Sequence, residues 1–243
     1  SEMCIRDRPE VNPQAILKHK GIIANPNCST IIMVMALKPI YDLAKIKRVI
    51  VSTYQAVSGA GKEGIDELDA QVREHSEGRE MTANILPSAS AEKHYPIAFN
   101  LIPQIDVFCD NLYTKEEMKM VNETKKIMED YEMRITATTI RVPVYRSHSE
   151  SVNIELEKEV DLGAMREALA KFPGVTVQDD PSKQEYPMPL YTSEKDDVYV
   201  GRLRRDESCE KSYNMWVVGD QIRKGAALNT LQIAETMIKN GWI

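Results

Sequence analysis

Segments rich in β-branched residues alternate with segments of helical periodicity along the chain, and this alternation restricts the fold more than any other feature. Residues 46–54 (IKRVIVSTY) are typical of a strand. Residues 28–43 carry apolar side chains at helical spacing, after a break, Asn25-Pro26-Asn27, that supplies a helix-capping residue. Further strands are expected over 135–145, 150–157, 197–204 and 213–219, and further helices over 63–76, from 115 to about 130, over 161–172 and from 225 to about 240. This order predicts an α+β fold in which helices cover one face of a sheet.

The connections between these segments favour a mixed sheet. Residues 135–145 and 150–157 are so close in sequence that we expect them to pair antiparallel. Residues 80–105 contain three prolines and are expected to form a long irregular connection. The capping box from Thr114 to Glu117 marks the start of the helix that follows. We therefore expect a mixed, largely antiparallel sheet with helices on one face.

The composition excludes several classes of protein. The 243 residues contain 31 Lys and Arg against 37 Asp and Glu, so that no basic excess indicates nucleic-acid binding. The longest clean apolar run, residues 31–37, is far shorter than the roughly 20 residues that a membrane helix needs. The cysteines, at positions 4, 28, 109 and 209, form no C-x-x-C pair and indicate reduced thiols of a cytoplasmic protein. We expect no metal site, no membrane partner and no nucleic-acid partner.

Cys28 and His148 have the chemistry for nucleophilic catalysis. Cys28 lies at the expected start of a helix, where unpaired backbone amides and the helix dipole favour a thiolate. His148 follows a strand-like segment, and a cysteine and a histidine that are distant in sequence can meet as nucleophile and base. The two residues alone leave a buried structural thiol and a histidine in a surface turn as alternatives.

Residues 59–64 (GAGKEG) match the dinucleotide-binding pattern G-x-G-x-x-G, after a strand and before a helix. The full pattern also requires a second strand with an acidic residue about 20 residues further on. The chain continues instead into a charged stretch and a loop with prolines. Glu63 stands where a phosphate-binding P-loop needs Ser or Thr after Lys62. We interpret the segment as a glycine loop that lets a ligand approach the backbone closely.

Six segments of the chain form a specific set. They are GIIANPNCST (21–30), TYQAVSGAG (53–61), NLIP (100–103), ETKKI (123–127), RVPV (141–144) and GAALN (225–229). In order and spacing, the set resembles the bacterial aspartate-semialdehyde dehydrogenases from about Pro9 to the last residue. The resemblance implies a catalytic domain like the C-terminal domain of glyceraldehyde-3-phosphate dehydrogenase, after the remnant of a Rossmann domain.

The resemblance also implies roles for the matched residues. Cys28 would form an acyl thioester, His148 would be the acid and base, and Gln55 would position the substrate. Arg141 would bind the substrate carboxylate through a bidentate fork, and Glu123 would bind the substrate amine. Because an even strand would put Arg141 and His148 on opposite faces, we expect a turn or bulge between them.

Phosphate and cofactor sites are implied in the same way. Phosphate would contact Asn27 and Lys126, and the nicotinamide end of NADP would contact Ser58, Gly59 and Asn229. The implied reaction is the reversible NADP-dependent reductive dephosphorylation of 4-phospho-L-aspartate to aspartate 4-semialdehyde, a step in lysine, diaminopimelate, threonine and methionine biosynthesis. A homodimer, or a dimer of dimers, is expected.

Four parts are expected along the chain. Residues 1–8 do not resemble the family and are interpreted as a foreign leader, and residues 9–26 as a remnant of the dinucleotide-binding domain. Residues 27–222 would be the catalytic and dimerisation domain, and residues 223–243 a helix that in the family packs on the dinucleotide-binding domain. The 243 residues are expected to be inactive alone. Alternative interpretations are a non-catalytic dimerisation fragment or subunit, and a related acyl-phosphate reductase.

Overall fold

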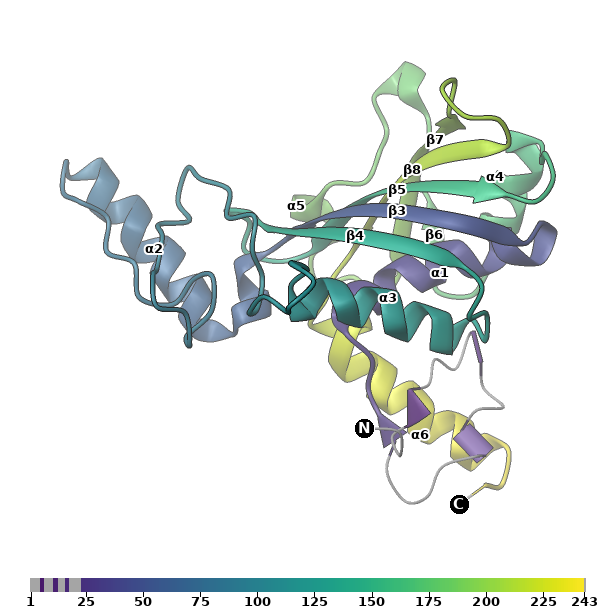
Figure 1. Cartoon of the computed structure of the whole chain (residues 1–243), viewed down its shortest axis with the longest axis horizontal. Coiled ribbons are helices and arrows are strands. Elements are labelled where there is room, and N and C mark those ends of the chain that lie inside the picture. The colour runs from purple at the N-terminus through teal and green to yellow at the C-terminus, as the bar shows by residue number, and fades with distance from the viewer. Residues whose placement is uncertain (1–4, 7–10, 13–15, 18–22, 243) are drawn as a thin grey trace.

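The computed structural model describes residues 5–6, 11–12, 16–17 and 23–242 (Figure 1). Most of the expected leader and remnant, including Cys4 and His19, therefore lies outside the described residues.

A six-stranded mixed sheet forms the centre of the molecule, in the order β4-β3-β5-β8-β7-β6. Its strands are β3 (Ile46–Gln55), β4 (Arg134–Arg141), β5 (His148–Leu156), β6 (Val175–Val177), β7 (Val198–Arg205) and β8 (Ser212–Gly219). Three of the five pairings are antiparallel, and the two outer pairings are parallel. The expected mixed, largely antiparallel sheet is confirmed.

The expected pairing between the strands β4 and β5 is wrong. β4 pairs in parallel with β3, β5 pairs antiparallel with the other edge of β3, and β3 therefore lies between them. The short connection 142–147 carries the chain past the end of β3 instead of forming a hairpin. Ser147, at a φ of 68°, makes the reversal at its end. Close sequence spacing favoured the hairpin, but it cannot reveal a third strand that comes from 80 residues earlier in the chain.

Three helices cover one face of the sheet: α1 (Cys28–Leu43), α3 (Lys115–Ile127) and α4 (Leu162–Lys171). α1 lies between the other two and is apolar all round over residues 31–37, each of which is fully buried. Val49, Val51, Val152 and Ile154 meet it from the sheet. The opposite face of the sheet is more open, since Tyr54 and Trp216 are half-buried there and Ser151 is exposed.

An arm projects from the edge of the sheet (Figure 1). It consists of η2 (Val57–Ala60), α2 (Lys62–Ser76) and the irregular connection expected over 80–105. Polar side chains of α2 organise this connection, because Gln71 Oε1 accepts hydrogen bonds from the amides of Ile97 and Ala98. A small apolar cluster closes the arm, made of Val57, Leu68, Leu86, Ile97, Ala98 and Ile102.

The remaining elements are short, except for the last helix. They are β1 (Ile5–Arg6), β2 (Ile23–Ala24), η3 (Pro181–Lys183), α5 (Pro189–Thr192), the π-helical turn η4 (Arg223–Ala227) and α6 (Leu228–Lys239). The helix expected from Gly225 thus begins with a π turn. Within the described part of the chain, no helix is long and apolar enough to span a bilayer.

Candidate active site

Cys28, at the start of α1, lies beside His148. Asn27 caps the helix, because its Oδ1 accepts the Thr30 amide at 3.0 Å. Cys28 is the first helical residue, and its Sγ lies 3.5 Å from Nε2 of His148, the first residue of β5. Gly225 of η4 packs on the cysteine so closely that an added Cβ would lie 2.8 Å from Cys28 Cβ. The cysteine and histidine that the sequence separates by 120 residues are therefore neighbours.

Both groups are neutral in this environment. Burial raises the pKa of the Cys28 thiol to about 12, and the Glu116 carboxylate adds to the effect. Burial also lowers the pKa of His148 well below its ordinary value, with the Arg141 charge acting in the same direction. The expectation that the helix start stabilises a thiolate does not hold for this structure, because loss of solvation outweighs the opposing effects of the Arg141 charge and of the hydrogen bonds from Ser29 on the pKa of Cys28.

Gln55 and Arg141 end two neighbouring parallel strands and are directly paired in the register. Arg141 is buried, and its Nη1 donates to the Ala56 carbonyl at 2.7 Å. Gln55 Nε2 donates to Thr53 Oγ1 at 3.2 Å. The turn expected between Arg141 and His148 is confirmed, since the connection 142–147 brings both side chains against the same glycine, Gly59.

Sequence reasoning missed the carboxylate that faces this group of residues, Glu116 on the first turn of α3. Its Oε1 accepts from Asn27 Nδ2 at 2.7 Å and from Gln55 Nε2 at 3.4 Å. Lys119, one turn further, lies 3.4 Å from Glu116 Oε2 and 3.2 Å from Asp106 Oδ2. The sequence did contain a signal for this second candidate. The segment of α3 carries the spacing E-x-x-K twice, at 116–119 and at 123–126, so Glu116 and Lys119 could have been considered beside Glu123 and Lys126.

The comparisons identify the family. Residues 37–224 match the family described as semialdehyde dehydrogenase, dimerisation domain. The aspartate-semialdehyde dehydrogenase of Aquifex aeolicus (strain VF5) is 54% identical over 237 residues, which are 97% of this chain and 68% of that protein. This chain belongs to the aspartate-semialdehyde dehydrogenase family.

Solved structures of aspartate-semialdehyde dehydrogenases share the fold. Aspartate semialdehyde dehydrogenase II of Vibrio cholerae complexed with ASA gives a TM-score of 0.91 at 44% identity, covering 98% of this chain and 69% of that chain. The enzyme of Candida albicans with NADP gives a TM-score of 0.73 at 23% identity, covering 99% of this chain and 68% of that chain.

Two of the residues matched to the aspartate-semialdehyde dehydrogenases lie further along α3. Glu123 is buried, and its Oε2 accepts the backbone amide of Asn27 at 2.6 Å, so that it holds the start of α1. Lys126 is half-buried and lies about 10 Å along the helix axis from Lys119, at 1.5 Å per residue. Glu116 therefore contacts Gln55 and acts on the Cys28 thiol, whereas the sequence-based choice, Glu123, contacts the backbone of Asn27.

The residues matched to the cofactor site lie on either side of this centre. Ser58 Oγ accepts a hydrogen bond from Gln221 Nε2. A Cβ added at Gly59 would lie 2.7 Å from Arg141 Nη1 and 3.3 Å from His148 Cε1, so that only glycine allows this approach. Asn229 is buried at the start of α6 and donates to Asn25 Oδ1 at 2.6 Å. Gly59 therefore presents bare backbone beside Arg141 and His148.

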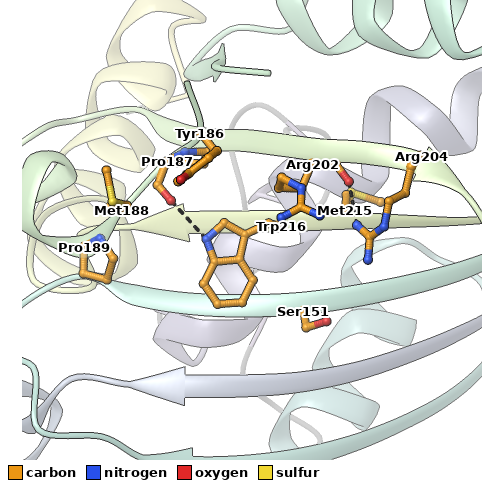
Figure 2. Close-up of a pocket in the computed structure, with 9 residues that line it drawn as sticks. All are labelled: Ser151, Tyr186, Pro187, Met188, Pro189, Arg202, Arg204, Met215 and Trp216. Atoms are coloured by element: carbon orange, nitrogen blue, oxygen red, sulfur yellow. Dashed lines mark hydrogen bonds between the residues drawn. The ribbon is translucent and has the colours of Figure 1, made fainter. Parts of the chain in front are cut away.

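A cavity of about 380 Å³ lies away from this chemistry, among residues of β5, β7, β8 and the 186–189 segment (Figure 2). Trp216 forms part of it and donates from Nε1 to the Pro187 carbonyl at 3.0 Å. Arg202, Arg204 and Ser151 also line it. It contains none of the residues matched to the catalytic site and belongs to the open face of the sheet.

Proposed function

We propose that this chain carries the catalytic centre of a reversible NADP-dependent aspartate-semialdehyde dehydrogenase. The reaction converts 4-phospho-L-aspartate to aspartate 4-semialdehyde, in the biosynthesis of lysine, threonine and methionine. The observation that carries the proposal is the 3.5 Å approach of Cys28 Sγ to His148 Nε2, beside a buried arginine and a buried glutamate.

Cys28 is the nucleophile in this proposal. In the oxidative direction its sulfur attacks the aldehyde carbon, and a thiohemiacetal forms. His148 Nε2 exchanges protons with the sulfur and with the substrate oxygen that lies beside it. NADP, when bound, supplies the hydride acceptor for the carbon held by Cys28. Phosphate then cleaves the thioester and releases the thiolate.

In this proposal, the residues that bind the α-carboxylate and the α-ammonium group of the amino acid select the substrate. Arg141 presents a planar fork that suits the α-carboxylate, and Glu116 presents a buried carboxylate that suits the ammonium group. We propose Glu116 for the amine in place of Glu123, because Glu116 contacts Gln55 whereas Glu123 holds the Asn27 amide. An N-acetylated substrate would leave no ammonium for Glu116, which argues against the related reductases.

Phosphate is proposed to lie near Asn27, with Lys119 and Lys126, the candidate that the sequence favoured, as the two cations that could bind it. Both lysines are on α3, but Lys119 is the one in contact with Glu116. Ser58, Gly59 and Asn229 are proposed to hold the nicotinamide end of NADP.

We also propose a homodimer formed through the open face of the sheet, around Tyr54, Ser151 and Trp216. The dimerisation-domain match over residues 37–224 and the half-buried aromatic side chains support it. The family resemblance also implies that two such dimers can associate as a dimer of dimers. The unpaired thiols of Cys28, Cys109 and Cys209 suit a cytoplasmic enzyme.

The test is phosphate-dependent formation of NADPH from aspartate 4-semialdehyde. Residues 1–243 are compared with the same chain fused after a family-type cofactor domain placed before Pro9. The fused chain is expected to turn over and its Cys28→Ser variant is not. Residues 1–243 alone are expected to be inactive, because remote cofactor contacts supply the binding energy that positions the reactive ring. Equal rates from the fused chain and its Cys28→Ser variant would refute the proposed function.

A further inference from the structure

The ring of His148 lies between a backbone amide and the sulfur of Cys28. Nδ1 accepts a hydrogen bond from the Ala56 N–H at 3.1 Å, while Nε2 faces Cys28 Sγ at 3.5 Å. A backbone amide can only donate, so Nδ1 must be without a proton. A neutral imidazole carries its one proton on the other nitrogen. The proton of His148 is therefore on Nε2 and points at the sulfur.

The surroundings oppose a second proton on this ring. The other ionisable groups that act on His148 and Cys28 are Arg141 from β4 and Glu116 from α3. Burial and the Arg141 charge lower the pKa of His148 well below its ordinary value. Glu150, two residues further along β5, has a pKa raised well above its ordinary value by burial, which disfavours a carboxylate charge beside the ring.

This tautomer cannot act as a base toward Cys28, because the nitrogen that faces the sulfur already holds a proton. Nε2 becomes an acceptor only when the proton moves to Nδ1. The Ala56 amide must first leave Nδ1, since two donors cannot share one hydrogen bond.

The carbonyl of Ala56 is bound by Arg141, the residue proposed to bind the substrate carboxylate. This carbonyl accepts from Arg141 Nη1 at 2.7 Å, while the amide of Ala56 holds His148. Ala56 is fully buried and connects the end of β3 to η2. The same carbonyl also accepts from the Gly59 amide at 3.1 Å. A substrate carboxylate that takes Arg141 Nη1 would therefore remove the shortest of the three hydrogen bonds that hold Ala56.

We propose that the backbone of Ala56 holds His148 in a non-basic tautomer until a carboxylate binds Arg141. Release of the amide lets the imidazole lose its proton from Nε2 and gain one at Nδ1, through water. Nε2 then takes the thiol proton as the Sγ–C bond forms, and returns it to the substrate oxygen. The imidazole ends neutral with its proton on Nδ1. The substrate-bound half of this inference rests on the proposed role of Arg141.

Nitrogen-15 NMR of the histidine rings tests the proposal. Long-range ¹H–¹⁵N correlations distinguish the two neutral tautomers from the imidazolium, and His148→Gln assigns the signals by their loss. The free protein is expected to show His148 with a protonated Nε2 and an unprotonated Nδ1. L-aspartate, which has the same α-amino and α-carboxylate groups as the substrate, is then added until the spectrum stops changing. A protonated Nδ1 is expected in that state.

A Cys28→Ala variant is the matched control, because it removes the sulfur and keeps the Ala56 amide. It is expected to retain the protonated Nε2. Loss of that tautomer in Cys28→Ala would mean that the sulfur sets it, which overturns the proposal. So would a protonated Nδ1 in the free protein, or an unchanged tautomer with L-aspartate. The spectrum of the free protein requires no turnover, so a failure of the proposed function in the NADPH assay would be seen separately.

Discussion

Cys28 is the residue on which the chemistry depends, and its burial makes it a weak nucleophile until the site is occupied. A thiol reacts through its thiolate, and burial raises the pKa of Cys28 to about 12. A cysteine that is mostly thiol at neutral pH reacts slowly with alkylating agents and oxidants.

The pH dependence of alkylation tests whether the pKa of Cys28 is raised. The rate at Cys28 with iodoacetamide is expected to rise about tenfold per pH unit from about pH 7 to about pH 10, because the thiolate fraction grows by that factor below the pKa. Site-resolved mass spectrometry measures it, with the exposed Cys209 as the internal reference. A plateau below pH 8 would contradict the prediction, since it would reveal a preformed thiolate.

Substitutions of the two glutamates of α3, Glu116 and Glu123, are expected to have different effects, one on activity and the other on stability. Glu116→Gln should lower kcat/KM of the fused enzyme for aspartate 4-semialdehyde by about 10- to 100-fold, through loss of a charged partner for the amine worth roughly 1.5–3 kcal/mol. Glu123→Gln should lower the free energy of unfolding by about 1–3 kcal/mol, because it weakens the 2.6 Å contact with the Asn27 amide. Enzyme kinetics and urea unfolding separate the two variants. The reverse pattern would return the amine role to Glu123.

The sequence could not decide between these two residues. Glu116 and Glu123 are seven positions apart, so they lie on the same face of the helix, and each is followed three residues later by lysine. Which of them reaches Gln55 depends on how far α3 extends along the sheet. That distance is a property of packing, which helical periodicity does not contain.

The elements themselves were largely predictable from local signals. The capping residue Asn27, the capping box at Thr114 and the β-branched run of β3 predicted their elements to within a few residues. The order of strands was not predictable, because β4 and β5 each pair with β3 rather than with each other. Local propensity determines which segments become strands, whereas contacts between distant segments determine their neighbours.

The capping box of α3 is expected to contribute to stability at the scale of the element. Thr114 Oγ1 accepts from the Glu117 amide, and the Glu117 carboxylate accepts from the amides of Thr114 and Thr139. Thr114→Ala should lower the free energy of unfolding by about 1 kcal/mol, the usual cost of losing an N-cap. Thr114→Ser keeps the hydroxyl and should recover most of the loss in urea titrations. Equal destabilisation by both variants would contradict a capping role.

At the scale of the whole molecule, the open face of the sheet is expected to hold the second protomer. Trp216 is on this face and lines the cavity shown in Figure 2. Trp216→Glu should convert a dimer to a monomer in sedimentation velocity, because a buried, unpaired charge at an interface is costly. Tyr131→Glu, an exposed position after α3, is the control and should leave the dimer intact. A dimer that survives Trp216→Glu would place the interface elsewhere.

Acyl transfer to Cys28 can be measured without a cofactor, and it tests the central claim most directly. Thiolate attack on 4-phospho-L-aspartate releases phosphate and leaves an aspartyl thioester on the protein. Intact-mass and peptide mass spectrometry of residues 1–243 should then show one aspartyl group on Cys28, with one equivalent of phosphate released. The Cys28→Ser variant should show neither. Phosphate release without an adduct, or an adduct on Cys109 or Cys209 in place of Cys28, would contradict the account.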